Sequence, residues 1–131
     1  MKEKKAISTG KSSAPIGLYS QAIETNGFVF TSGQINSLPD GTMVGGTFKE
    51  QARQALENLK AVVEASGAKL SDVAKVTVYL TDMGNYADLN EAYAEFFKAP
   101  FPARAVVQVT ALPKGSSLEI EAVAAKEIDR G

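Results

Sequence analysis

The segment from Leu18 to Ile35, LYSQAIETNGFVFTSGQI, predicts a β-hairpin. Asn26 and Gly27 at its centre supply the two positive-φ residues of a type I′ turn, and β-prone residues flank them on both sides. This turn sets four opposed pairs across the hairpin: Thr25 with Phe28, Ile23 with Phe30, Gln21 with Ser32, and Tyr19 with Gln34. Because opposed residues share a face, polar side chains are expected together at the end away from the turn.

The residues on both sides of this hairpin predict an α+β fold. A short strand is expected at residues 5–8. Thr47 and Glu50 have the spacing of a helix capping box, apolar residues follow at helical spacing, and Gly67 ends the pattern. A strand at 75–81, a helix at 85–98 and strands at 104–111 and 118–125 come next. This order favours a single mixed sheet with both helices on one face.

The last two strands alternate in character. In the first of them we expect one face to pack against the helices and the other to stay uncovered. The residues assigned to the helix side are Ala105, Val107, Val109 and Ala111, and those assigned to the uncovered side are Arg104, Val106, Gln108 and Thr110. In the last strand Glu119 and Glu121 lie opposite an apolar face. Arg104 and Glu119 are therefore expected on one uncovered face, buried against other copies of the chain.

Arg104 follows Pro102 closely and has no acidic residue within several positions. A guanidinium stays charged, so a desolvated one requires an anionic partner. Glu119 or Glu121 could form a permanent ion pair with it, or a ligand carboxylate could bind it through two parallel hydrogen bonds. The strand pattern leaves both alternatives open. Asn90 lies beside the aromatic face of the second helix and also needs a hydrogen-bond partner.

Composition excludes several kinds of chemistry. The 131 residues fit one domain, residues 1–131, and carry 14 basic and 15 acidic side chains, so nucleic acid is not an expected partner. With no His and no Cys, the commonest general base, thiolate chemistry and the usual metal ligands are absent. The N-terminal lysines, interrupted by Glu3 and followed by no apolar stretch, predict neither a signal peptide nor a membrane anchor. We expect a cytoplasmic protein.

Four stretches together resemble the Rid (YjgF) family of reactive-intermediate deaminases. They are Ile16–Ala22 (IGLYSQA), Thr31–Ile35 (TSGQI), Phe101–Ala105 (FPARA) and Leu118–Ala124 (LEIEAVA). They occur in the same order as in the family and span nearly the whole chain. Each stretch is weak alone, but the combination is specific.

The resemblance implies a chorismate-mutase-like fold, a barrel-forming homotrimer and sites between subunits. It implies hydrolysis of reactive 2-imino and enamine acids (2-aminoacrylate, 2-iminopropanoate, 2-iminobutanoate) to 2-keto acids and ammonia, without a metal or cofactor. By the same resemblance Arg104 holds the substrate carboxylate and Glu119 positions or activates water. The implied pocket residues are Tyr19, Ser32, Gly33, Asn90 and Val106.

Two positions depart from the family pattern, and a second function stays open. Val106 stands where many members have cysteine, and the segment at residues 98–100 looks shorter than in many relatives. A non-catalytic sensor or protein-interaction module could use the same carboxylate-binding cleft, because a shared fold does not fix an activity. Gly33 also has a structural interpretation, as a bulge or a point of close backbone approach.

Overall fold

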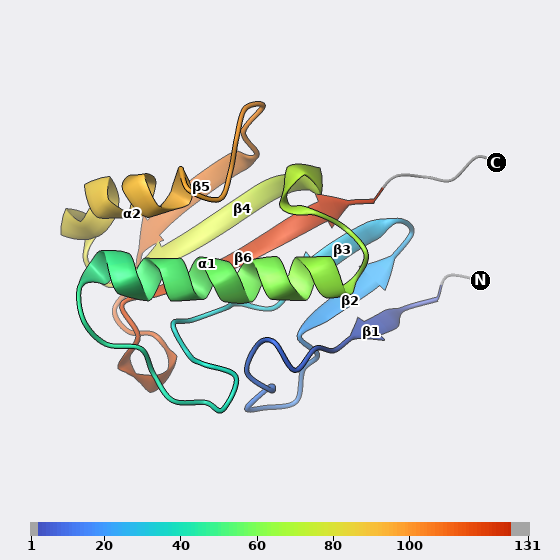
Figure 1. Cartoon of the computed structure of the whole chain (residues 1–131), viewed down its shortest axis with the longest axis horizontal. Coiled ribbons are helices and arrows are strands. Elements are labelled where there is room, and N and C mark those ends of the chain that lie inside the picture. The colour runs from blue at the N-terminus through green and yellow to red at the C-terminus, as the bar shows by residue number, and fades with distance from the viewer. Residues whose placement is uncertain (1–2, 127–131) are drawn as a thin grey trace.

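The computed structural model describes residues 3–126; Met1, Lys2 and residues 127–131 lie outside it. The described residues form one six-stranded sheet in the order β1-β2-β3-β6-β4-β5, together with two α-helices (Figure 1). The elements are β1 (Lys5–Ile7), β2 (Ala22–Thr25), β3 (Phe28–Thr31), α1 (Phe48–Ala65), β4 (Val73–Leu80), α2 (Tyr86–Tyr93), β5 (Ala103–Gln108) and β6 (Leu118–Ala125). Short 3₁₀ turns occupy Leu70–Asp72, Met83–Asn85 and Pro113–Gly115. The predicted α+β element order is confirmed.

The hairpin forms around the predicted turn, with Asn26 at φ 53° and Gly27 at φ 81°. Thr25 pairs with Phe28 and Ile23 with Phe30, as the turn requires. The pairing ends sooner than expected at the far end, because Gln34 forms a bridge to Ile120 of β6 instead of facing Tyr19. Tyr19 lies in a loop. The polar end of the hairpin is therefore remodelled by the neighbouring strand.

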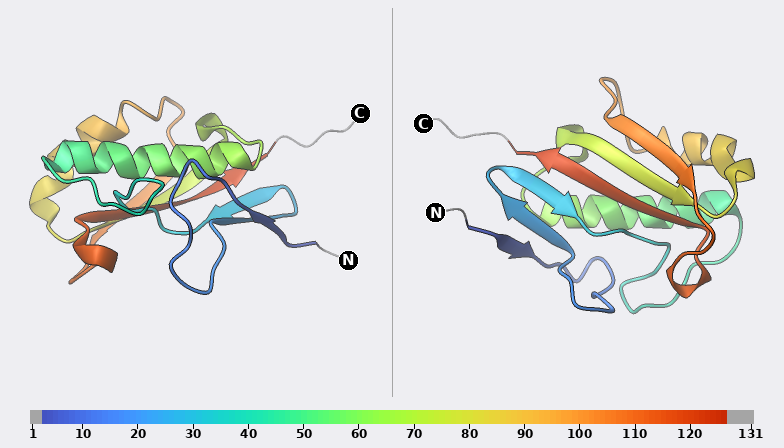
Figure 2. Two further views of the ribbon diagram at one scale, coloured as in Figure 1. Left: turned by 60° about the horizontal axis from the view of Figure 1, so that its bottom comes forward. Right: turned by 180° about the vertical axis from the view of Figure 1, so that it is seen from behind.

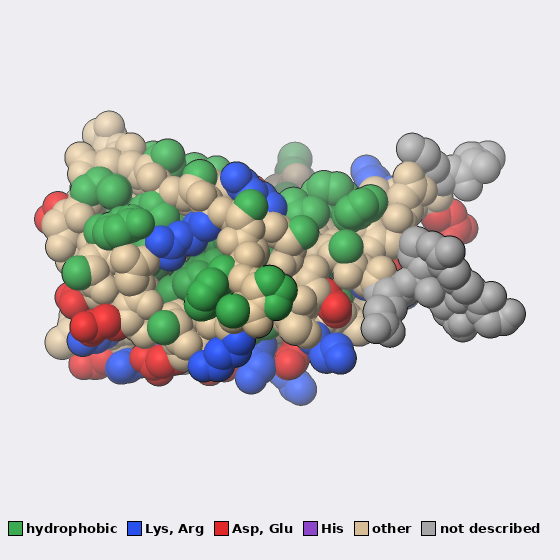
Figure 3. All heavy atoms as spheres, turned by 90° about the horizontal axis from the view of Figure 1, so that it is seen from above, with side chains coloured by type: hydrophobic (Ala, Val, Ile, Leu, Met, Phe, Trp, Pro, Cys, Tyr) green, Lys and Arg blue, Asp and Glu red, His purple; other side chains and the backbone are tan. Residues whose placement is uncertain are grey.

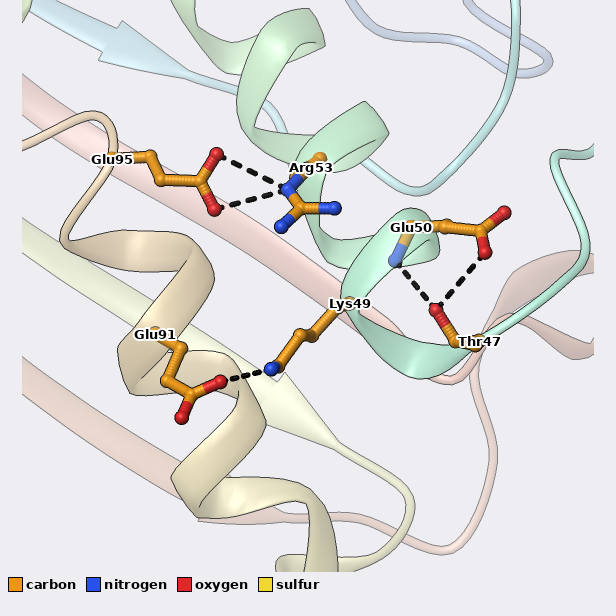
Figure 4. Close-up of polar contacts among 6 residues, drawn as sticks. All are labelled: Thr47, Lys49, Glu50, Arg53, Glu91 and Glu95. Atoms are coloured by element: carbon orange, nitrogen blue, oxygen red, sulfur yellow. Dashed lines mark hydrogen bonds and ion pairs between the residues drawn. The ribbon is translucent and has the colours of Figure 1, made fainter.

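Both helices cover one face of the sheet, as predicted (Figures 1 and 2). The fully buried side chains of α1 and of the central strands form the core between these layers. Thr47 caps α1, since its hydroxyl accepts a hydrogen bond from the Glu50 amide at 3.2 Å. The ion pair Lys49–Glu91 joins the exposed sides of α1 and α2, and Arg53–Glu95 joins α1 to the turn that follows α2 (Figure 4). The second helix ends at Tyr93 and not at residue 98, because turns replace the helix before the prolines.

The face assignment of β5 from sequence is wrong. β5 pairs in parallel with β4, which places Arg104 beside Val76 and Val106 beside Val78. Val76 and Val78 are fully buried beneath the helices, so Arg104, Val106 and Gln108 lie on the helix-covered face. The strand also ends at Gln108 and not at residue 111. The alternation within β5 favours burial of its apolar face, but the parallel register with β4 places the face with Arg104 and Gln108 under the helices.

The opposite face of the sheet has no covering layer within residues 3–126 (Figure 2, right). It carries Phe28 and Phe30, each 45% exposed, and Val107 at 41%. Val123 pairs with Phe30 across β3 and β6 on the same face. Glu119 and Glu121 of β6 also lie here, opposite Tyr79 and Thr77 of β4. We call this surface the open face.

Candidate functional site

The guanidinium of Arg104 lies at the edge of the sheet, beneath α2. Its Nη2 donates hydrogen bonds to Asn90 Oδ1 at 2.8 Å and to Tyr86 Oη at 3.2 Å. The Tyr93 ring lies 4.7 Å from the guanidinium carbon, and the Tyr86 ring lies 5.7 Å away. Figure 3 looks onto this edge of the molecule, where hydrophobic side chains adjoin Lys and Arg side chains. Asn90 thus finds the partner that its position required.

The charge of Arg104 is not neutralised inside the described chain. None of the ion pairs in residues 3–126 involves it. Its Nε and Nη1 donate no hydrogen bond to any described residue, although a guanidinium offers five N–H donors in a planar fork. Glu121, one of the two expected acidic partners, instead accepts a hydrogen bond from the Tyr79 hydroxyl at 2.6 Å. The arrangement therefore leaves the N–H donors of Nε and Nη1 free for an anionic ligand such as a carboxylate.

Glu119 forms a second cluster, at a pocket of about 50 Å³. A Cβ placed on Gly33 would lie 2.5 Å from the Glu119 Cδ, so only glycine leaves room for this carboxylate. The close neighbour of Gly33 is thus a side chain and not another stretch of backbone. Burial, and secondarily the charge of Glu121, raise the pKa of Glu119. The pocket has room for one or two waters beside the carboxylate.

Tyr19 and Ser32 belong to the surroundings of Glu119. Tyr19 lines the same pocket, is about half exposed, and its hydroxyl accepts a hydrogen bond from the Ile16 amide at 3.2 Å. The Ser32 hydroxyl donates to the Ser20 carbonyl at 2.5 Å. Since its proton is used in this bond and no histidine exists in the chain, Ser32 does not have the surroundings of a nucleophile.

The structure thus divides the predicted site residues into two groups on opposite faces of the sheet. Arg104 and Asn90 lie with Val106 on the helix side, and Val106 packs against the core. Tyr19, Ser32 and Gly33 lie near Glu119, on β6 and the loops beside it. The expectation that Arg104 and Glu119 share one face is wrong, because the parallel register of β5 turns Arg104 toward α2.

Sequence reasoning did not identify the two tyrosines that hold Arg104. Tyr86 and Tyr93 belong to the aromatic face of the second helix, beside which the sequence pattern places Asn90. The available signal was their spacing: Tyr86, Asn90 and Tyr93 recur at intervals of four and three, which places them on one helical face. Because the strand carrying Arg104 was assigned the opposite orientation, this signal could not be connected to the arginine.

Two further observations concern metal binding and membrane-spanning helices. Within the described part of the chain, no three His, Cys, Asp or Glu side chains come together as a metal site would require. Neither α1 nor α2 combines the length and apolar character needed to cross a membrane.

The chain belongs to the Endoribonuclease L-PSP family, which it matches over residues 9–126. A RutC family protein of Pyrococcus horikoshii is 52% identical over 125 residues, covering 95% of this chain and 99% of that protein. The human 2-iminobutanoate/2-iminopropanoate deaminase is 46% identical over 122 residues, covering 92% of this chain and 89% of that protein. The crystal structure of Escherichia coli TdcF with bound serine superposes with a TM-score of 0.89 at 42% identity, covering 94% and 99% of the two chains.

Proposed function

We propose that this protein is an enzyme that hydrolyses 2-imino acids, such as 2-iminopropanoate and 2-iminobutanoate, to 2-keto acids and ammonia. The observation that carries the proposal is the guanidinium of Arg104, which has neutral partners, free donors and no acidic partner among the described residues. Relatives from mite, human, rat and mouse, 45–46% identical, are named 2-iminobutanoate/2-iminopropanoate deaminase. The family name Endoribonuclease L-PSP refers to RNA cleavage. A net charge of −1, however, provides no basic excess for binding RNA.

The reaction requires little beyond orientation and a placed water. Arg104 holds the substrate carboxylate and fixes the imine carbon relative to Glu119. The Glu119 carboxylate accepts a proton from water as the water oxygen bonds to the carbon of the protonated imine, which gives a neutral carbinolamine. The Glu119 carboxyl group then returns this proton to the amine nitrogen. The C–N bond breaks as the hydroxyl proton passes to the Glu119 carboxylate and the carbonyl forms, and ammonia leaves, taking that proton from Glu119 as ammonium. Orientation of this kind supplies about 7 to 11 kcal/mol in favourable cases.

The raised pKa of Glu119 suits the role of proton acceptor. Burial is the main cause, because it disfavours the charged carboxylate. A more basic carboxylate is a stronger general base, provided that it is ionised at the working pH. Tyr19 and the Ser32–Gly33 backbone would line the water side of the pocket, while Asn90 and the Val106 backbone would line the carboxylate side.

Two copies of the chain would have to form each site. Arg104 and Glu119 lie on opposite faces of one sheet, so one molecule of substrate cannot contact both within a single chain. The open face exposes Phe28, Phe30 and Val107 in a patch that fits contact with other copies. We infer a homotrimer around this face, with Arg104 of one copy completing the pocket of Glu119 from the next.

Subunit mixing tests the shared site directly. Arg104→Ala and Glu119→Ala are each expected to lose imine hydrolysis as homogeneous proteins. The two variants are then unfolded together in equal amounts and refolded into random trimers. Each trimer that contains both variants regains one site in which an intact Arg104 meets an intact Glu119. The mixture should therefore recover about a quarter of the wild-type activity. Each variant refolded alone is the control. A mixture with no recovered activity, although subunit exchange is verified by mass, would contradict the shared site.

A sensor that binds small carboxylates without turnover is the second candidate. It is favoured by the cluster around Arg104, which can bind a carboxylate without Glu119, and by the relative TdcF, whose structure contains bound serine. Generating 2-iminopropanoate with an amino-acid oxidase and following its decay separates the two functions. Accelerated decay supports the enzyme. Binding of pyruvate without any acceleration would support the sensor.

A further inference from the structure

The ring of Tyr93 makes the closest aromatic contact with Arg104. Tyr93 is 6% exposed, and Phe97 stacks on its ring with a centroid distance of 4.5 Å and an interplanar angle of 25°. The guanidinium carbon lies 4.7 Å from the centroid of this ring. The cation therefore rests on a buried aromatic pair that has little freedom to move. A positive charge over an aromatic face is attracted by the ring quadrupole.

The contacts of Arg104 with α2 fix its orientation in two independent ways. Asn90 and Tyr86 accept hydrogen bonds from Nη2, which fixes one corner of the fork. The Tyr93 ring supports the guanidinium from one side, with its centroid 4.7 Å from the guanidinium carbon. Together they leave Nε and Nη1 without partners among the described residues. A long side chain loses much rotamer freedom on binding a ligand, and holding it in place beforehand avoids that loss at the moment of binding.

We propose that Tyr93 is a positioning residue for carboxylate binding: its ring supports the Arg104 guanidinium, so that the free Nε and Nη1 donors are presented to the carboxylate of a 2-imino or 2-keto acid. This proposal rests on the role proposed above for Arg104. It assigns Tyr93 no contact with the reacting atoms. The expected effect is therefore on substrate affinity rather than on the chemical step.

The ring, and not the hydroxyl, is the part that acts. The Tyr93 hydroxyl is buried, and no described residue forms a hydrogen bond with it. Tyr86 contributes in the opposite way, because its ring is more distant at 5.7 Å and its hydroxyl bonds Nη2. Tyr93→Phe should therefore preserve the function of the residue. Tyr93→Leu and Tyr93→Met keep an apolar side chain but remove the quadrupole.

Phe96 provides a matched control. It lies three residues beyond Tyr93, is partly buried, and packs against the same core. Of the described aromatic side chains, only those of Tyr86 and Tyr93 lie over Arg104. Phe96→Leu therefore removes an aromatic ring from the same region without removing a contact with the guanidinium.

The experiment measures the Kd for pyruvate, the KM and kcat for 2-iminopropanoate, and thermal stability for each variant. Tyr93→Leu and Tyr93→Met should raise the KM and the pyruvate Kd by about 3- to 30-fold, with a smaller change in kcat. Tyr93→Phe and Phe96→Leu should keep both within about twofold of wild type. Using two apolar replacements at position 93 keeps the test informative if one of them fails to fold.

Distinct outcomes separate this proposal from the one on which it rests. If the apolar replacements at Tyr93 bind pyruvate as well as Phe96→Leu does, the positioning role is wrong. A loss of affinity in Tyr93→Phe equal to that in Tyr93→Leu would also overturn it, because the hydroxyl would then be responsible. If Arg104→Ala itself binds pyruvate with unchanged affinity and keeps its activity, the role proposed for Arg104 fails whatever Tyr93 does.

Discussion

At the scale of single residues, Glu119 and Gly33 depend on each other. The carboxylate occupies the space where any other residue at position 33 would place its Cβ. That Cβ would meet the far end of a flexible side chain and not the backbone, so the chain can respond by moving Glu119 aside. The residue type at position 33 therefore controls where the proposed proton acceptor lies, more than it controls folding.

Gly33→Ala is expected to lower kcat/KM by at least about tenfold, since a displacement of about 1 Å at a catalytic group can cost a hundredfold. Thermal stability should change little, because the displaced group can rotate away. Steady-state kinetics and thermal unfolding measure the two quantities. Gly10→Ala is the control, as nothing lies within 4 Å of a Cβ at that position. Unchanged kinetics in Gly33→Ala would show that the position of Glu119 is not limiting.

At the scale of elements, α1 holds the loop that lines the Glu119 pocket. Asn58 of α1 is 1% exposed, and its Nδ2 donates to the carbonyls of Ile35 at 2.9 Å and Ser37 at 2.6 Å. Ile35 and Ser37 both line that pocket. A polar residue on the buried side of a helix thus satisfies two loop carbonyls and connects the helix layer to the site.

Asn58→Ala should lower the free energy of unfolding by about 2 to 4 kcal/mol, because it leaves two carbonyls without their donor. We also expect a higher KM, since the pocket wall loses its support. Urea unfolding at fixed protein concentration and steady-state kinetics provide the measurements. Gln54→Ala removes only the bond to Asn58 Oδ1, so it should cost much less. Equal losses in the two variants would contradict this role for Asn58.

At the scale of the whole molecule, the open face is the surface available for association. It is apolar near β3 and acidic near the middle of β6, where Tyr79 hydrogen bonds Glu121. Exposed aromatic side chains on one side of a sheet are costly in water, whereas the apolar side chains of β4 and β6 that face the helices are buried. Oligomer formation and activity should therefore be lost together when this surface is changed.

Val123→Glu places a charge opposite Phe30 in the centre of this patch. We expect it to dissociate the oligomer and to abolish imine hydrolysis, while far-ultraviolet circular dichroism stays that of a folded chain. Sedimentation velocity measures the association state. Glu57→Lys, which changes the charge by two units on the exposed side of α1, should keep both association and activity. A Val123→Glu protein that remains fully active as a monomer would overturn the shared site.

The sequence by itself determined the elements and most of the candidate residues. Asn26 and Gly27 specify the hairpin because their positive φ angles are local, and the period of the apolar residues specifies α1 and β6 for the same reason. The missing His and Cys limit the chemistry before any folding is considered. The sequence shows no acidic residue close to Arg104 along the chain, but it left open an ion pair with Glu119 or Glu121, and the ion pairs among the described residues do not include Arg104.

Only the tertiary structure decided how these residues meet. The alternation within β5 favoured the opposite orientation, and the actual one follows from the parallel register with β4 and from the packing of α2 above the strand. That orientation separates Arg104 from Glu119 and joins it to Tyr86, Asn90 and Tyr93. Such contacts connect residues distant in sequence, and their free energy depends on the packing of the whole sheet, which no local pattern encodes.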